Sequence, residues 1–107
     1  MLKSGTRSTT ELLSYIRKSI ENSVELSKLV RNYAPNDVFF EQGKKITHLY
    51  LVLEGEVKLN RRHQDDTTMD LITLAPGHFV GLVAFTTGNP TLTSAIATKP
   101  SVVFRVR

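Results

Sequence analysis

The chain contains no cysteine and no tryptophan, and only 7% of its residues are aromatic. The lack of cysteine excludes disulfide bonds, thiolate zinc sites, iron–sulfur clusters and thiol nucleophiles, and it fits a reducing compartment. No apolar run reaches the roughly 18 residues that a membrane span needs, and the N-terminus lacks the apolar segment of a secretory signal. We therefore expect a soluble, cytoplasmic protein with no membrane partner.

The length of 107 residues suits a single domain with a core of its own, which excludes a multi-domain enzyme. The net charge of +4 comes from 14 basic and 10 acidic residues. Six of these basic residues but only three of the acidic ones lie in residues 1–33. Basic side chains are ordinary on solvated helix faces, and no base-reading motif accompanies them. We expect no direct nucleic-acid binding by this segment; a basic nucleic-acid patch is the alternative.

Apolar residues in the N-terminal third recur at the spacing of a helix, every fourth residue, at Leu12, Ile16, Ile20 and Val24. This pattern predicts an amphipathic helix over about residues 9–32, which Pro35 ends because the residue before a proline is disfavoured in a helix. The apolar stripe either packs on the domain's own core or contacts a second chain, so a homodimer is possible.

Two sequence signals place the ends of this helical segment. Ser8 and Glu11 have the spacing of a capping box, which predicts a helix start there and an irregular tail before it. Asn22 and Glu25 have the same spacing, so two shorter helices with a break near residues 21–23 are the alternative.

After Pro35 the pattern changes to short runs of β-branched and aromatic residues separated by turn residues. These runs predict strands near residues 38–41, 47–53, 56–61, 68–74, 78–80, 92–98 and 101–106. The residues from 81 to 87 fit either a buried strand or a short helix between strands. Strands that alternate apolar and polar residues, joined by tight turns, favour a mainly β fold of antiparallel, jelly-roll type.

Residues from about 24 to 106 resemble the cyclic-nucleotide-binding domain family, the β-roll (double-stranded β-helix) found in catabolite activator protein-like sensors. The resemblance rests on spaced signatures: Pro35-Asn36-Asp37-Val38, Gly43, the block from Leu49 to Val57, Leu74-Ala75-Pro76-Gly77, Phe79 with Gly81, Asn89-Pro90 and Ala97. It implies a roll whose segment 81–93 is a phosphate-binding cassette. In such a cassette, helix amides and an arginine hold the cyclic phosphate.

The chain departs from the family at both charged positions of this cassette. Family members typically carry a glutamate after the glycine and an arginine shortly after a proline, whereas here these positions hold Leu82 and Thr91. No arginine or lysine lies between Arg62 and Lys99, so a shift of register does not restore the charge. The cassette is degenerate, and we expect no high-affinity binding of cyclic AMP or cyclic GMP in the usual way.

The candidate ligand-binding residues are those of this neutral cassette: Gly81, Leu82, Val83, Ala84, Pro90, Thr91, Leu92 and Thr93. Three interpretations stay open. Leu82 and Leu92 fill the pocket as core; or the amides of residues 81–84 and the hydroxyls of Thr91 and Thr93 bind a different small effector; or cyclic nucleotides bind weakly.

Neither a metal site nor a catalytic site is expected, and no cofactor. The three histidines, His48, His63 and His78, lie on separate segments and lack the spacing of a cupin-type metal site. Asp65 and Asp66, next to basic residues, have the composition of a solvated hairpin loop.

We therefore expect an N-terminal tail and helical lead in residues 1–33 and a β-roll sensor in residues 34–107. The expected function is that of a regulatory, non-enzymatic sensor domain of a larger signalling or transcription-related protein. The effector domain and the helices before it are expected to follow Arg107, which would make this chain a truncated piece. The alternative is a ligand-free protein–protein interaction or dimerisation module.

Overall fold

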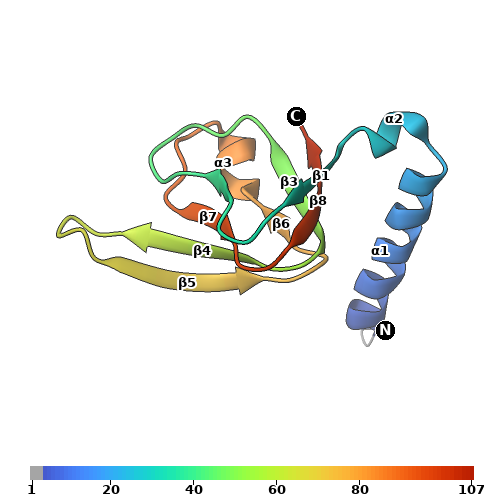
Figure 1. The fold of residues 1–107 in the computed structure, drawn as a ribbon, viewed down its shortest axis with the longest axis horizontal. Helices are drawn as coiled ribbons and strands as arrows, with labels where there is room; N and C mark the ends of the chain where they lie inside the picture. Colours follow the sequence, from blue (N-terminus) through green and yellow to red (C-terminus); the bar gives the residue numbers. More distant parts are fainter. Residues whose placement is uncertain (1–3) are drawn as a thin grey trace.

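A computed structural model describes residues 4–107. Two helices open the chain, α1 (Ser4–Glu21) and α2 (Val24–Ser27), and a third, α3 (Leu82–Thr87), lies between strands. The strands are β1 (Val30–Tyr33), β2 (Val38–Phe40), β3 (Leu49–Glu54), β4 (Val57–Arg62), β5 (Thr68–Leu74), β6 (Phe79–Val80), β7 (Ser94–Ala97) and β8 (Ser101–Val106). Figure 1 shows the roll with α1 standing beside it.

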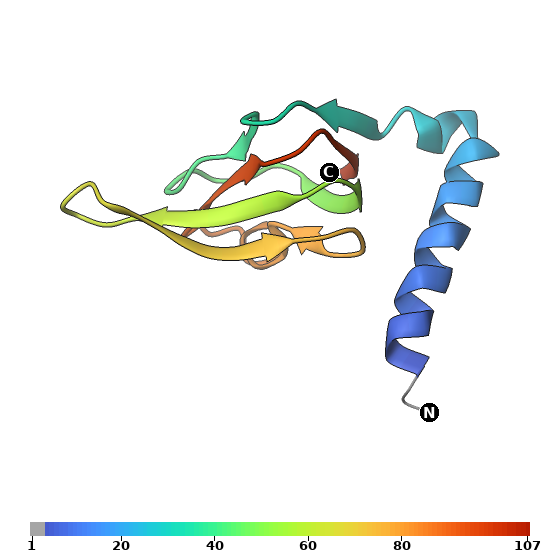
Figure 2. The ribbon, with the colours of Figure 1, turned by 60° about the horizontal axis from the view of Figure 1, so that its bottom comes forward.

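The strands form two antiparallel sheets of four strands each, in the orders β1-β8-β3-β6 and β2-β7-β4-β5. Strands that follow one another in the chain mostly belong to different sheets, so the sheets are built from distant segments. The mainly β, jelly-roll-like architecture predicted from the sequence is confirmed. Figure 2 shows the two sheets in profile and the β4–β5 hairpin extending beyond them.

The core lies between the sheets and is built from the inward-facing residues of both. Four valines, Val52, Val57, Val80 and Val103, are fully buried at 0% exposure. They come from β3, β4, β6 and β8, and β7 adds Ala95 and Ala97, so both sheets contribute to this cluster. Small and β-branched side chains allow the two sheets to approach closely.

Helix α1 packs on the outer face of the first sheet. Ile20 is buried with Leu51 and Leu53 of β3, and Leu13 and Ile16 flank them, which accounts for the apolar stripe. The guanidinium of Arg17 donates hydrogen bonds to the carbonyl of Leu53 and to the carboxylate of Glu54. The stripe is therefore at least in part a contact within the chain.

The boundaries of the helical lead differ from those predicted. Helix α1 begins at Ser4, so Ser8 lies inside it and the predicted helix start was wrong. The predicted break near 21–23 is confirmed, but the cap is Ser23, whose side chain accepts from the Leu26 amide at 3.2 Å, and not Asn22. Residues 1–3 of the predicted tail lie outside the described part of the chain.

The prediction of helix up to residue 32 was also wrong, because residues 30–33 form β1 and pair with β8. Val30 lies opposite Phe104 and Tyr33 opposite Ser101. β8 lies between β1 and β3, so without β1 its second edge would lack backbone partners. This long-range pairing overrides the helical periodicity of the local sequence.

Candidate ligand-binding site

The segment predicted as a cassette begins at Gly81, and the structure gives two reasons why this position holds a glycine. Gly81 has φ of 86°, in the left-handed region, and is the residue before α3. A Cβ on Gly81 would lie 2.6 Å from the Ile46 side chain and 3.2 Å from the Phe40 ring. The ambiguity over residues 81–87 is thus resolved as a short helix that is packed against the loop before β3.

Helix α3 presents its first amides without acceptors inside the helix. The first helical bond is from the Phe85 amide to the Gly81 carbonyl at 2.9 Å, so the amides of Leu82, Val83 and Ala84 precede it. The helix ends at Gly88, whose amide donates to the Ala84 carbonyl at 2.9 Å. The helix is only six residues long, so its dipole is small.

Leu82 and Leu92 do not fill the interior. Leu82 is 46% exposed and Leu92 is 70% exposed, and Val83 beside them is 75% exposed. The interpretation that these leucines complete the core was therefore wrong. The valine and alanine core between the sheets does not include them.

Thr91 is the buried residue of the loop, at 6% exposure, and its polar atoms are satisfied locally. Its amide donates to the Lys44 carbonyl at 2.9 Å, and its carbonyl accepts from the Gly43 amide at 2.8 Å. Its hydroxyl donates to the Thr93 carbonyl at 3.0 Å. The Thr91 hydroxyl, which one of the three interpretations assigned to a ligand, is thus engaged in holding the loop, while Pro90 before it is exposed.

The hydrogen bonds of Thr91 to Gly43 and Lys44 place the loop before β3 next to the cassette, and the sequence analysis had not named this loop as part of the site. This loop contains two basic residues, Lys44 and Lys45, and the backbone of Lys44 bonds to Thr91. The only sequence signal for this loop was Gly43 at the turn. The cassette itself remains uncharged, because no Asp, Glu, Lys or Arg lies between Asp70 and Lys99.

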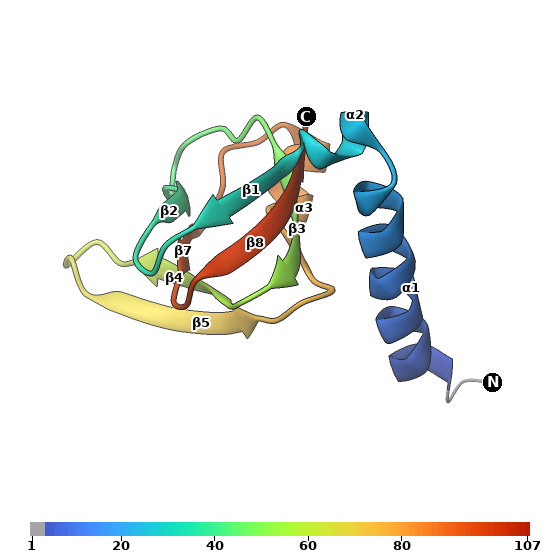
Figure 3. The same cartoon turned by 45° about the vertical axis from the view of Figure 1, so that its right-hand side comes forward.

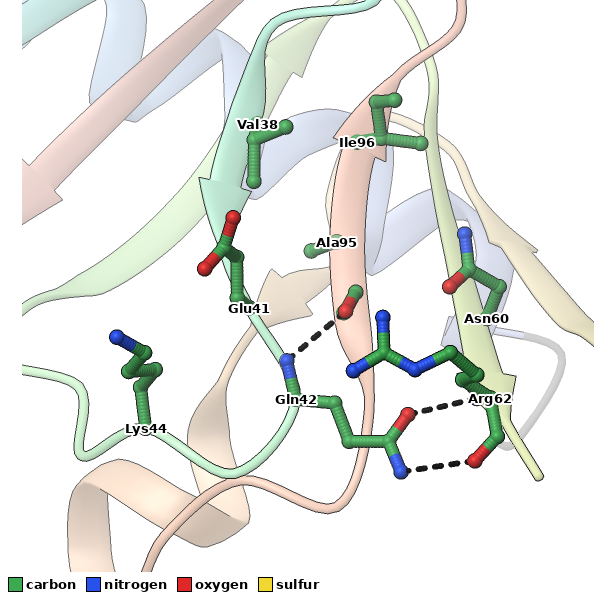
Figure 4. Close-up of a pocket in the computed structure, with 9 residues that line it drawn as sticks. Val38, Glu41, Gln42, Lys44, Asn60, Arg62, Ala95 and Ile96 are labelled. Carbon is green, nitrogen blue, oxygen red and sulfur yellow. Dashed lines mark hydrogen bonds between the residues drawn. The ribbon is translucent and has the colours of Figure 1, made fainter. Parts of the chain in front are cut away.

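A polar pocket of about 290 Å³ lies on the outer face of the second sheet, beside this loop. Figure 4 shows the Gln42 side chain bridging to the backbone of Arg62, accepting from its amide at 2.7 Å and donating to its carbonyl at 3.1 Å. The Gln42 amide donates to the Ser94 hydroxyl at 2.8 Å. These bonds fasten the 41–44 loop to β4 and β7, and none of the eight cassette residues lines this pocket.

The other sequence candidates lie apart from the cassette. His48 precedes β3, His63 lies in the hairpin between β4 and β5, and His78 precedes β6. Within residues 4–107 no three His, Asp or Glu side chains gather in a way that could hold a metal ion. Asp65 accepts from the amide and hydroxyl of Thr67, an arrangement that shapes the hairpin turn. None of the described helices has the length and hydropathy to cross a membrane.

The fold agrees with the comparison to known families. The profile of the cyclic nucleotide-binding domain matches residues 30–107, and the chain belongs to this family. The match begins at β1 and covers every strand of the roll.

Several solved structures have the same fold. The catabolite activator protein of Thermus thermophilus has a TM-score of 0.68 at 27% identity, over 78% of this chain and 42% of that one. The N-terminal domain of a transcriptional regulator from Streptomyces coelicolor has a TM-score of 0.68 at 25% identity, over 72% of this chain and 54% of that one.

A third similar structure is the regulatory subunit of a cAMP-independent protein kinase A from Trypanosoma cruzi bound to guanosine. Its TM-score is 0.67 at 19% identity, over 72% of this chain and 28% of that one, so it supports the fold alone. The chain thus spans about half or less of the proteins that it matches. A sequence search of the curated proteins finds no match.

Proposed function

We propose that this chain is the regulatory sensor domain of a larger signalling or transcription-related protein, and that it does not bind cyclic AMP or cyclic GMP in the usual way. The observation that carries the proposal is the uncharged cassette, with Leu82 and Thr91 at the positions where the family has its charged ligand groups. Membership of the family supports a sensor without catalytic activity of its own. The cysteine-free composition is consistent with the reducing cytoplasm, where we place it.

The energetic argument concerns the phosphate. A cyclic phosphate is a monoanion, and in this fold it would be withdrawn from water against α3. Loss of a hydrogen-bonded charge partner at such a site costs about 2–5 kcal/mol, or roughly 30-fold to several thousand-fold in affinity. The amides of residues 82–84 alone do not supply a countercharge.

The donors that remain suit an uncharged effector. Amides at the start of α3 can bind a carbonyl or hydroxyl oxygen, and the exposed Leu82, Val83 and Leu92 can cover an apolar group. Guanosine, bound in the kinase regulatory subunit with this fold, is a ligand that carries no phosphate. It is therefore a suitable neutral probe for this chain.

The test is isothermal titration calorimetry of this chain with cyclic AMP, cyclic GMP and guanosine. We expect neither cyclic nucleotide to bind with micromolar affinity. A double variant, Leu82→Glu with Thr91→Arg, restores the charged pair and should gain at least about 30-fold for a cyclic nucleotide. Leu82→Glu with Thr91→Gln is the matched control, since glutamine is long but uncharged, and it should gain nothing. Micromolar binding of either cyclic nucleotide to the unmodified chain would overturn the proposal.

The second candidate function is a ligand-free interaction or dimerisation module. It is favoured by an apolar groove of about 420 Å³ between α1 and the first sheet, bordered by Tyr15, Phe79 and Phe104. Tyr15 is 70% exposed and Leu12 is 58% exposed. Sedimentation velocity tests it: self-association that Leu12→Lys abolishes and Met69→Lys leaves intact would support this candidate, and a strict monomer at high concentration would argue against self-association.

A further inference from the structure

A group of basic side chains gathers at one end of the first sheet. Arg31 of β1 lies opposite Val103 of β8, and Arg105 is two residues further along β8. In an antiparallel pair, opposed residues and residues two apart on one strand share a face. Arg31 and Arg105 therefore lie on the same face as Val103, which is fully buried and faces the other sheet. Figure 3 shows β1 and β8 side by side near the C-terminus.

A third strand adds to this group from the other side of β8. Tyr50 of β3 lies opposite Arg105, and Leu49 lies opposite Val106. Extending this register by one residue places His48 opposite Arg107, on the same face as Tyr50 and Arg105. The rings of His48 and Tyr50 are 6.4 Å apart between centroids. The guanidinium groups of Arg31, Arg105 and Arg107 and the imidazole of His48 thus lie at the same end of the first sheet.

Among the side chains that the structure describes, no carboxylate pairs with these positive charges. The ion pairs of the described side chains join Arg17 to Glu54 and Lys58 to Asp70, and none involves the three arginines. Nη1 of Arg31 donates to the carbonyls of Lys28 and Val30, and no hydrogen bond joins its other nitrogens to the described part of the chain. The pKa of His48 is lowered, first by burial and then by the positive charges of Arg105, Arg107 and Arg31.

The floor next to this group is aromatic and contains a pocket. Tyr33 stacks on Phe39 with centroids 4.0 Å apart, and Tyr50 meets Phe39 edge-on at 5.2 Å. A pocket of about 250 Å³ lies beside Tyr50. This pocket is lined by Lys44, Lys45 and Glu41 and not by the arginines or His48, so it is a neighbour of the basic group and not part of it.

We propose that Arg31, Arg105, Arg107 and His48 form a binding site for a small polyanion that carries phosphate or carboxylate groups. Planar guanidinium groups bind such groups with paired hydrogen bonds, and several of them together favour a ligand with two or more charges. The site uses strands β1, β3 and β8 and none of the cassette residues, so it does not rest on the proposed function.

The test is a titration of the chain with inorganic pyrophosphate, and with citrate as the carboxylate arm, at constant ionic strength. NMR of the imidazole resonances follows each histidine, with His63 and His78 as internal references. A bound polyanion stabilises the charged imidazole, so the pKa of His48 should rise toward or above 6.5 in its presence. Arg105→Gln should weaken binding at least about 10-fold.

The matched control is Arg61→Gln, which removes the same charge from the exposed β4–β5 hairpin and should leave the affinity unchanged. An equal loss in both variants would overturn the proposal, since it would show attraction to net charge alone. An unchanged His48 titration in saturating pyrophosphate and in saturating citrate would also overturn it. If Arg105→Gln does not fold, the affinity is measured with Arg31→Gln instead. The shift of the His48 pKa in the unmodified chain tests the proposal without any variant. A response to only one of the two anions identifies the phosphate or the carboxylate as the ligand group.

Discussion

Gly55, in the turn between β3 and β4, connects the two sheets, and the effect of replacing it by alanine can be worked out. Its φ is 94°, a conformation that costs a residue with a Cβ about 1–2 kcal/mol. A Cβ there would also lie 2.5 Å from the Pro100 carbonyl oxygen and 2.6 Å from the Ser101 Cα. Both atoms belong to backbone, so relief needs movement of the turn before β8, which adds about 1–3 kcal/mol.

Gly55→Ala should therefore lower the free energy of unfolding by about 2–5 kcal/mol. In a domain of this size each kcal/mol shifts Tm by about 4 °C, so we expect a drop of about 8–20 °C by circular dichroism. Gly43→Ala is the matched control: φ is 89°, but no atom lies within 4 Å of the added Cβ, so only the conformational part of about 1–2 kcal/mol applies. Equal destabilisation of the two variants would refute the close packing of this turn against β8.

Three further predictions concern single groups. Burial raises the pKa of Tyr50 to about 12, so the tyrosine hydroxyl keeps its proton in the folded state and loses it above pH 10 in the unfolded state. Chemical denaturation should therefore show a stability that falls between about pH 10 and 12, and Tyr50→Phe should not show this fall. The pKa of His48 is lowered in the folded state, so the unfolded state binds more protons near pH 6.5. The free energy of unfolding should therefore fall as the pH drops through 6.5, and His48→Gln should reduce this pH dependence. Ser23→Ala removes the cap of α2 and should cost about 1 kcal/mol in chemical denaturation, whereas Ser27→Ala, on the exposed end of the same helix, should cost less.

The strands of the roll could be predicted well from local patterns, because their alternation and turn residues are local features. The predicted run at 68–74 and the run at 101–106 coincide with β5 and β8. β1 could not be found this way, because residues 30–33 continue a helical periodicity and become a strand only through their bonds to β8. The partner lies about seventy residues away in the chain, beyond any local signal.

In the cassette, too, some features follow from the residue types and others only from the packing. Its neutrality follows from the residue types alone, since no charged residue occurs between Asp70 and Lys99. The exposure of Leu82 and Leu92 does not follow, because a leucine has the same chemistry in a core and on a surface, and only the closed packing of the two sheets decides between them. The engagement of the Thr91 hydroxyl depends likewise on a turn that the surrounding loops impose.

The sequence by itself determined the family, the antiparallel roll and the absence of charge at the cassette, because turn residues, alternation and side-chain chemistry are readable position by position. The tertiary structure alone decided that Arg31, His48 and Arg105 share one face, because they come from three segments that meet only when β1 and β3 pair with β8. Electrostatic repulsion among such groups is weak in the extended chain and increases when strand pairing brings them together. For this reason the distribution of positive charge over the folded surface, unlike its total, is a property of the fold.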